Sequence, residues 1–197
     1  MFTGIISHIG RFIAYRQGRQ EIVIEASSEI LQLNIGESLA VNGVCLSLIK
    51  KEKNQASFSL SGETLQKTNL GACRRGDILN LERPLTLSTL LSGHLVSGHI
   101  DGTEKLLRIT TRNKETRMTF SLSPGIQPYL VEKGSVAVNG ISLTLAEVKP
   151  SSFEVVIIPI TLENTNLSAL KRGDSVNVES DMIGKYVYNM LPKKILK

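Results

Sequence analysis

The feature that most constrains this chain is an internal repeat. Residues 41–48 read VNGVCLSL, and residues 138–145, 97 positions further on, read VNGISLTL. At the same spacing, residues 63–83 and residues 160–180 agree at 11 of 21 positions. Agreement over so long a stretch indicates two copies of one structural unit.

The repeat also predicts how the chain is divided. A weaker match links residues 3–6 with residues 97–100 at an offset of 94, so the second copy carries a short insertion. We therefore expect an N-terminal unit at residues 1–90, a C-terminal unit at residues 91–181 and an unmatched tail at residues 182–197. A chain of 197 residues is long enough for two small cores.

Within each copy the residue pattern is that of strands. Asn42-Gly43 and Asn139-Gly140 lie between apolar-alternating flanks and predict tight hairpin turns, because both central residues of such turns need positive φ. The pattern predicts an all-β fold of two tandem homologous six-stranded Greek-key β-barrels. Segments that alternate apolar and polar residues, or are rich in β-branched ones, are 21–26, 56–60, 77–82, 117–122, 153–158 and 174–179.

The tail has a different pattern. Asp181 is a typical N-cap residue, and we expect an amphipathic α-helix from there to near Pro192. Beyond two closed barrels such a helix is expected to make oligomer contacts, with packing on a barrel as the alternative. Its apolar residues at near-helical spacing are Ile183, Val187, Met190 and Leu191.

Composition excludes several classes of function. The 23 Lys and Arg residues are scattered and aromatic residues make up 5%, so the net charge of +5 does not indicate a nucleic-acid partner.

No apolar run approaches the length of a membrane span, and the N-terminal residues lack a signal-peptide pattern, so we expect a cytoplasmic protein. Cys45 and Cys73 are not at disulfide or metal-ligand spacing, and no nicotinamide or ATP motif is present.

A polar strand face is the first candidate site. Cys45 and Ser47 are two residues apart on the strand after the first Asn-Gly turn, and therefore share one face. The second copy places Ser142 and Thr144 at the same positions. Three hydroxyls among four positions favour a hydrogen-bonding surface, although most lone cysteines are small buried hydrophobes.

Two of the three histidines, His94 and His99, lie within the segment SGHLVSGH. On an extended strand, residues five apart point to opposite faces, so a joint metal site is not expected. Each could exchange protons near neutral pH or be merely structural.

Taken together, several motifs resemble one family. MFTGII, VNGVCLSL, TNLG with RRGD and LNLER, SGHLVSGHIDG, KGSVAVNGISLTL and VNVESDMIGKY are similar in order and spacing to riboflavin synthase of the alpha-chain type, over residues 1–186. The resemblance implies a dismutation: two molecules of 6,7-dimethyl-8-ribityllumazine exchange a four-carbon unit and yield riboflavin and 5-amino-6-ribitylamino-uracil. It implies no metal and no redox cofactor.

The resemblance also implies an assembly. The family forms a homotrimer through its C-terminal helices, and each barrel binds one lumazine. The productive site lies where the N-terminal barrel of one subunit faces the C-terminal barrel of another. Association with lumazine synthase is left open, as is the question of which pocket holds the donor. The alternative function is a non-catalytic lumazine or flavin carrier of the same fold.

The resemblance assigns residues to two pockets. Cys45 and His99 are implied in the chemistry, with His94, Ser47 and Asp181 beside them. The first pocket comprises Gly4, Ile5, Ile6, Cys45, Leu46, Ser47, Ser59, Leu60, Ser61, Gly62, Glu63 and Thr64, the last six read as a strand. The second comprises Gly98, His99, Ile100, Lys133, Ser142, Leu143, Thr144, Val156, Ile157, Ile158, Pro159, Ile160 and Thr161. Ile160 departs from the polar residue common at its position.

Overall fold

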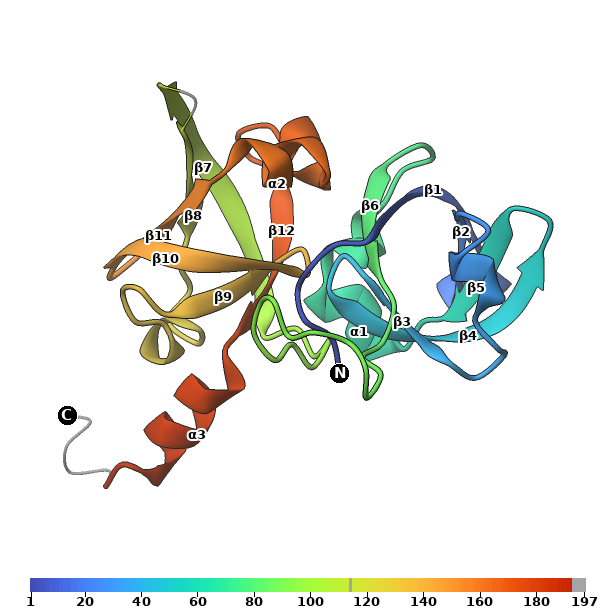
Figure 1. Ribbon diagram of the computed structural model, residues 1–197, viewed down its shortest axis with the longest axis horizontal. Helices are drawn as coiled ribbons and strands as arrows, with labels where there is room; N and C mark the ends of the chain where they lie inside the picture. Colours follow the sequence, from blue (N-terminus) through green and yellow to red (C-terminus); the bar gives the residue numbers. More distant parts are fainter. Residues whose placement is uncertain (114, 193–197) are drawn as a thin grey trace.

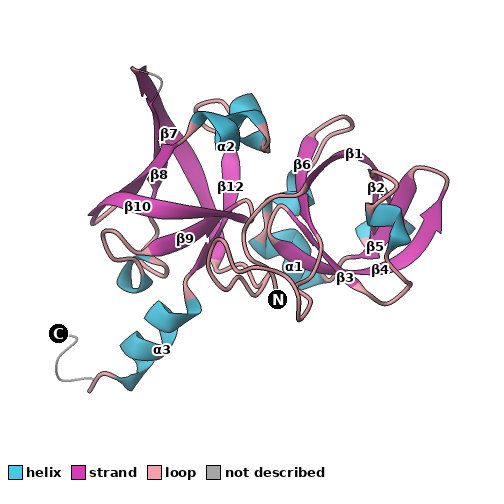
Figure 2. Ribbon diagram, viewed as in Figure 1, coloured by secondary structure: helices cyan, strands magenta, loops and turns pink. Residues whose placement is uncertain are grey.

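Two β-barrels lie side by side in the computed structural model, which describes residues 1–113 and 115–192 (Figure 1). Both barrels consist mainly of strands, and the helices that connect these strands are short (Figure 2). The predicted fold class, two tandem six-stranded barrels followed by a C-terminal helix, is confirmed.

The first barrel is closed by six strands in the order β1-β2-β5-β4-β3-β6. Closure follows from β1, which pairs with β2 on one side and with β6 on the other. Its elements are β1 (His8–Arg16), η1 (Gln17–Arg19), β2 (Glu21–Glu25), η2 (Ile30–Gln32), β3 (Ser38–Val41), β4 (Val44–Glu52), β5 (Gln55–Ser59), α1 (Gly62–Lys67), η3 (Asn69–Ala72) and β6 (Ile78–Glu82).

The second barrel repeats this arrangement, with strands in the order β10-β11-β8-β7-β12-β9. Each strand has the neighbours of its counterpart six strands earlier, as expected of a duplicated unit. Its elements are β7 (Gly102–Arg112), β8 (Glu115–Ser121), η4 (Gln127–Tyr129), β9 (Ser135–Val138), β10 (Ile141–Lys149), β11 (Ser152–Ile157), α2 (Pro159–Glu163), η5 (Asn166–Ala169) and β12 (Ser175–Ser180).

Each barrel has its own apolar core. Leu48 and Phe58 fill the first barrel, and Phe120 stacks on Phe153 in the second with ring centroids 5.3 Å apart. Full burial of such side chains contributes about 1.5–3 kcal/mol each. Because strands alternate inward and outward residues, the polar positions of β4 and β10 remain on the outside of the barrels.

The two predicted Asn-Gly turns are confirmed, and they meet back to back between the barrels. Asn42 and Gly43 have φ of 47° and 79°, and Asn139 and Gly140 have φ of 46° and 79°. A Cβ added to either glycine would lie 2.7 Å from the backbone nitrogen of the other. The turns therefore need glycine both for their φ angles and for the close approach of the two copies.

Asparagine side chains join the barrels around an approximate two-fold axis. The Asn69 backbone N–H donates to Asn177 Oδ1 at 2.7 Å, and the Asn166 backbone N–H donates to Asn80 Oδ1 at 2.8 Å. In the first bond the N-terminal copy donates, and in the second the C-terminal copy donates. The interface therefore has the symmetry of the repeat. Six asparagines form the network: Asn42, Asn69, Asn80, Asn139, Asn166 and Asn177.

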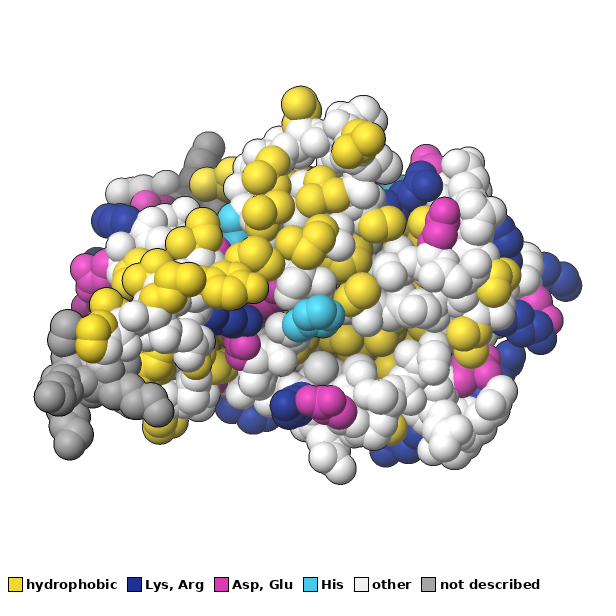
Figure 3. All heavy atoms as spheres, turned by 90° about the horizontal axis from the view of Figure 1, so that it is seen from below, with side chains coloured by type: hydrophobic (Ala, Val, Ile, Leu, Met, Phe, Trp, Pro, Cys, Tyr) yellow, Lys and Arg dark blue, Asp and Glu magenta, His cyan; other side chains and the backbone are white. Residues whose placement is uncertain are grey.

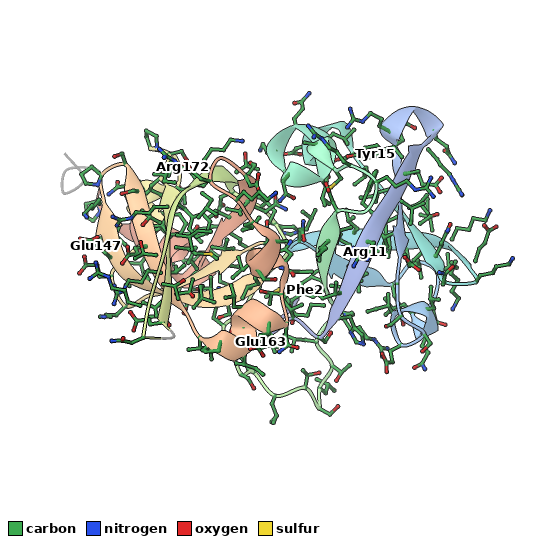
Figure 4. All side chains as sticks on the ribbon, turned by 90° about the horizontal axis from the view of Figure 1, so that it is seen from above. Phe2, Arg11, Tyr15, Glu147, Glu163 and Arg172 are labelled. Carbon is green, nitrogen blue, oxygen red and sulfur yellow. The ribbon has the colours of Figure 1, made fainter. Side chains whose placement is uncertain are left out.

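The N-terminal segment also runs between the barrels. Phe2 is fully buried there and exchanges two backbone hydrogen bonds with Val96, of 2.8 and 3.1 Å (Figure 4). The pair packs against Ala40 of β3 and Ala137 of β9. This small apolar cluster places the segments around residues 2–4 and 96–98 at the junction of the two units.

The tail forms α3 (Met182–Met190), which extends from the second barrel (Figure 1). Asp181 is its N-cap, as predicted, and accepts a 3.0 Å bond from the Ile183 backbone N–H. One face packs on the second barrel, where the ring of Tyr188 meets Tyr129 edge-on at 5.4 Å. The opposite face leaves large apolar side chains exposed, namely Ile183, Tyr186, Val187 and Met190.

The space-filling view from below shows hydrophobic side chains gathered over a broad area that spans both barrels (Figure 3). The segment that joins the barrels exposes four leucines: Leu87, Leu90, Leu91 and Leu95. Among the described residues, no helix has both the length and the apolar character needed to cross a membrane.

Candidate functional site

Two polar strand faces lie at equivalent places on the outside of the barrels. On β4, Leu46 and Leu48 point into the core, whereas Cys45 is half-buried and Ser47 is exposed. On β10, Ser142 is half-buried and Thr144 is exposed. The predicted shared faces are confirmed. Cys45 also touches the cluster around Phe2, so part of its surface is packed.

Strand pairing extends each polar face by one serine. Ser38 of β3 lies opposite Ser47, and Ser135 of β9 lies opposite Thr144. Residues paired across neighbouring strands project to the same face. The sequence alone does not predict either serine as a site residue, because an isolated serine before an Asn-Gly turn is not a functional motif. Their matching places in the repeat, 97 residues apart, are the one signal that could have found them.

The structure corrects the predicted grouping of the two pockets. The Ser142 backbone N–H donates to the Gly4 carbonyl at 2.8 Å, and the Cys45 backbone N–H donates to the Gly98 carbonyl at 2.9 Å. The N-terminal segment therefore lies on β10 of the second barrel, and the segment at residues 97–100 lies on β4 of the first. We call residues 3–6 and residues 97–100 the leading segments of the two copies. Each leading segment lies against the barrel of the other copy.

Apolar packing gives the same crossed arrangement. Ile6 packs against the core of the second barrel, and Ile100 packs against the core of the first. Ile5 and His99, which lie between these anchors and the glycines, have exposed side chains. Gly4, Ile5 and Ile6 thus accompany Ser142, whereas Gly98, His99 and Ile100 accompany Cys45.

A histidine is hydrogen-bonded at the second polar face. His94 Nδ1 lies 2.7 Å from Ser142 Oγ, and the ring is almost fully buried. Burial lowers the pKa of His94 below the usual 6.5, and the nearby charge of Asp181 partly opposes that shift. A neutral imidazole in this position can take a proton from the Ser142 hydroxyl.

Lys133 has a backbone conformation uncommon for its residue type. Its φ is +65°, and its side chain is exposed at the turn before β9. The first copy has Gly36 at the equivalent place, with φ of +91°. A side chain held in a left-handed conformation costs of order 1–3 kcal/mol, which marks the residue as worth testing for function.

The two segments read as strands bend into helices. Ser59 ends β5, and Ser61 Oγ then accepts a 3.0 Å bond from the Thr64 N–H, capping α1. In the second copy, Ile157 ends β11 and Pro159 opens α2. The prediction of strands through residue 64 and residue 161 is wrong, because the Ser cap in one copy and the Pro in the other start helices.

The remaining predicted residues divide by burial. Val156 and Thr161 are half-buried, whereas Gly62, Glu63, Ile158 and Ile160 are exposed around the two helix starts. Four others have buried side chains and can offer only main-chain groups to a ligand: Leu46, Leu60, Leu143 and Ile157.

A cavity of about 480 Å³ lies elsewhere, between the barrels at the asparagine network. None of the predicted site residues lines it. Asn69 and Asn166, which do line it, are already hydrogen-bonded across the interface, so the cavity is a feature of that interface. Cys73 also lines it, and burial raises the pKa of this thiol to about 12, which makes it unreactive near neutral pH.

Among residues 1–113 and 115–192, no group of three or more His, Cys, Asp or Glu side chains could hold a metal ion.

The family match to known proteins occurs twice, once in each copy of the repeat. Residues 3–84 and residues 97–181 each match the family described as the lumazine binding domain. Riboflavin synthase of Actinobacillus pleuropneumoniae is 40% identical over 196 residues, which cover 98% of this chain and 91% of that protein. Riboflavin synthase of Escherichia coli (strain K12) is 38% identical over 185 residues, covering 92% and 87%.

Solved structures of the same fold include LumP. Its complex with 6,7-dimethyl-8-(1'-D-ribityl) lumazine has a TM-score of 0.81 at 21% identity, covering 91% of this chain and 99% of that chain. Its complex with riboflavin has a TM-score of 0.82 at 22% identity with the same coverage. At these identities the likeness concerns the fold.

Proposed function

We propose that this chain, which belongs to the riboflavin synthase family, converts two molecules of 6,7-dimethyl-8-ribityllumazine into riboflavin and 5-amino-6-ribitylamino-uracil. The observation that carries the proposal is its similarity to riboflavin synthases over nearly the whole chain. The duplicated polar faces fit a reaction between two identical molecules, because each barrel can hold one of them.

Holding the two substrates in fixed orientation supplies part of the catalysis. A reaction between two bound molecules avoids much of the entropic cost of a bimolecular encounter. Main-chain groups of β4 and β10 suit the hydrogen-bonding edge of the ring, and the hydroxyls of Ser47 and Thr144 suit the ribityl chain. Ser38 and Ser135 extend these hydroxyl surfaces.

We assign proton abstraction to the second barrel. Ser142 Oγ accepts a proton from the C7 methyl group of one lumazine and passes its own proton to neutral His94 Nδ1. The negative charge of Asp181 stabilises the imidazolium that forms. The resulting carbanion is the nucleophile that joins the two lumazines.

We assign activation of the other lumazine to the first barrel. The Cys45 thiol adds to a C=N bond of the ring, forming an S–C bond while the ring nitrogen takes the proton. Loss of the thiol in a later elimination restores Cys45. We assign proton transfer in these steps to His99, whose exposed side chain belongs to the segment that lies along Cys45.

The direct test is to incubate the purified protein with dimethylribityllumazine and follow riboflavin by absorbance and fluorescence. Riboflavin and the uracil product should appear in equal amounts. Tight binding with no turnover would instead support the second candidate, a lumazine or flavin carrier, which the fold shared with the ligand complexes of LumP favours.

The proposal includes a homotrimer assembled through the outward face of α3, with each productive site made from two subunits. Ile183, Val187 and Met190 on that face support it, because exposed apolar side chains at helical spacing suit a partner helix. A chain truncated before Met182 should sediment as a monomer. A truncated chain that remains a trimer would contradict this mode of assembly.

Mixing two inactive variants tests whether sites cross subunits. Cys45→Ala and Ser142→Ala chains, unfolded and refolded together, should regain part of the activity, because some interfaces would pair an intact first barrel with an intact second one. Mixtures as inactive as the separate variants would contradict shared sites. Association with lumazine synthase belongs to the same proposal, and co-sedimentation of the two purified proteins tests it.

A further inference from the structure

Two glutamates at the ends of equivalent strands are almost fully buried. Glu82 ends β6 of the first barrel, and Glu179 lies near the end of β12 of the second. Burying a carboxylate is costly unless hydrogen-bond donors replace the lost water. Each of these carboxylates accepts three hydrogen bonds, and all six donors belong to the two leading segments.

The two sets of bonds match almost atom for atom. Glu82 Oε1 accepts from the Thr3 backbone N–H at 2.6 Å and from its hydroxyl at 2.7 Å, and Oε2 accepts from the Gly4 N–H at 3.0 Å. Glu179 Oε1 accepts from the Ser97 N–H at 2.7 Å and its hydroxyl at 2.6 Å, and Oε2 accepts from the Gly98 N–H at 3.0 Å.

Each glycine connects its glutamate to the opposite barrel. Gly4 gives its N–H to Glu82, and its carbonyl accepts from the Ser142 N–H at 2.8 Å. A Cβ added to Gly4 would lie 2.6 Å from Ser142 Cβ, and the φ of Gly4 is +76°. One residue therefore touches both the carboxylate of the first barrel and the reactive strand of the second.

The other connection runs in the reverse direction. Gly98 gives its N–H to Glu179 of the second barrel, and its carbonyl accepts from the Cys45 N–H of the first at 2.9 Å. A Cβ added to Gly98 would lie 2.5 Å from Cys45 Cβ, and its φ is +84°. Each buried carboxylate is thus two hydrogen bonds away from the reactive residue of the other barrel.

The connection from Glu82 has a second branch. Thr3, held by Glu82 through two bonds, accepts a 3.1 Å hydrogen bond at its carbonyl from the His94 N–H. Glu82 therefore supports both members of the Ser142–His94 pair, one through Gly4 and the other through Thr3.

We infer that Glu82 and Glu179 are positioning residues that act crosswise, Glu82 holding the Ser142–His94 site of the second barrel and Glu179 holding the Cys45 site of the first. Neither carboxylate contacts these reactive side chains directly. Each fixes the leading segment that covers the other barrel's site. The inference deepens the proposed function, but its geometry is independent of turnover.

Two readouts that need no activity test the crosswise action. The first is the rate at which iodoacetamide alkylates Cys45, followed by mass spectrometry. The second is the NMR titration of the His94 ring, assigned with a His94→Gln variant. Because neither requires riboflavin formation, a protein that binds lumazine without turnover could still give the predicted result, and failure of the two proposals can be told apart.

Glu179→Gln should speed alkylation of Cys45 at least about tenfold, the effect expected when a buried hydrogen bond to a charged group is lost, and should leave the His94 titration unchanged.

Glu82→Gln should move the pKa of His94 upward toward the ordinary histidine value, because loosening Thr3 exposes the ring, and should leave Cys45 alkylation unchanged. Effects confined to the barrel that carries each glutamate, or no effect on either readout, would overturn the inference.

Glu104→Gln is the matched control. This glutamate is also buried in the second barrel and accepts hydrogen bonds from the Ser121 hydroxyl and the Ser123 N–H, at 2.5 and 2.6 Å, within its own barrel. Its variant should lower the midpoint of thermal unfolding without changing either readout. A change in both readouts with Glu104→Gln would mean that general destabilisation explains the effects of the other variants.

Smaller changes keep the test valid if a glutamate variant does not fold. Ser97→Ala removes one hydroxyl bond and should still speed Cys45 alkylation, whereas Ser97→Thr restores the residue type found at Thr3 and should return the wild-type rate. Equal rates for the Ala and Thr variants would contradict a positioning role for the contact with Glu179.

Discussion

Strands β4 and β10 have matching positions in the two barrels but carry different side chains there. Both follow an Asn-Gly turn, both carry a hydroxyl residue at matching positions, Ser47 and Thr144, and both are covered by a glycine segment from the other copy. The first strand presents Cys45, which is half-buried. The second presents Ser142, hydrogen-bonded to His94 and close to the charge of Asp181.

This difference shows which parts of the duplicated unit were kept and which diverged. The turns, the asparagine network and the glutamate contacts retain the symmetry of the repeat, because they hold the barrels together. The groups that could move protons do not: Pro84 stands where the second copy has Asp181. In the proposed function, the shared residues bind two identical molecules and the divergent ones treat them differently.

The largest effect is expected from His94→Gln. Loss of the base beside Ser142 should lower kcat for riboflavin formation roughly 100- to 1,000-fold, the usual contribution of general acid–base catalysis. Lumazine affinity, measured by fluorescence titration, should change little. His8→Gln is the control, since His8 lies on β1 with Ser7 and Glu29 as partners and should keep wild-type kcat. Wild-type kcat in His94→Gln would make His94 a structural residue.

A smaller effect, on pH dependence, is expected from Asp181→Asn. The Asp181 charge raises the pKa of His94, so its removal should move the acid limb of the kcat/KM profile to lower pH. Asn is itself a good N-cap, so α3 should be retained. An acid limb that stays in place or moves to higher pH would show that Asp181 does not act on His94.

The same lowered pKa affects stability in the wild-type protein. Because His94 binds a proton less readily in the folded than in the unfolded chain, the free energy of unfolding gains a contribution above the usual histidine pKa of 6.5. That contribution is lost as the pH falls through the folded-state pKa. Denaturant melts of the wild type and of His94→Gln between pH 5 and 8, about the histidine range, should differ in this dependence.

The smallest effect on activity is expected from Cys73→Ala. Cys73 lies at the cavity between the barrels, its thiol pKa is raised to about 12 by burial, and it is absent from both polar faces. Its removal should cost about 1 kcal/mol in the free energy of unfolding and leave kcat within about twofold. Rapid alkylation of Cys73 at neutral pH, seen by mass spectrometry, would contradict the burial argument.

The fold could be predicted from the sequence because local signals and the repeat agreed. The Asn-Gly turns fixed the hairpins, and the duplication doubled every strand pattern. Helices α1 and α2 are not predicted, because the strand-like pattern continues past Ser59 as alternation and past Ile157 as an apolar, β-branched run. The serine cap of α1 and the proline that opens α2 are short signals by comparison.

The crossed arrangement could not be predicted in the same way. An exchange of leading segments between two similar barrels leaves every local pattern unchanged, since both segments carry a glycine at the same place and both strands follow an Asn-Gly turn. The hydrogen bonds of Ser142 and Cys45 and the packing of Ile6 and Ile100 distinguish the alternatives. Matching glutamates near the ends of both copies were visible in the sequence, but their long-range partners were not.

In the proposed mechanism, Cys45 and Ser142 carry out different steps on two identical substrates. Cys45→Ser and Ser142→Cys test this difference, because each variant gives both strands the same residue with little change in size. Each variant should still bind two lumazines per chain by fluorescence titration but lose kcat, roughly 100-fold for Cys45→Ser. Wild-type kcat in both variants would contradict the claim that the two sites are chemically distinct.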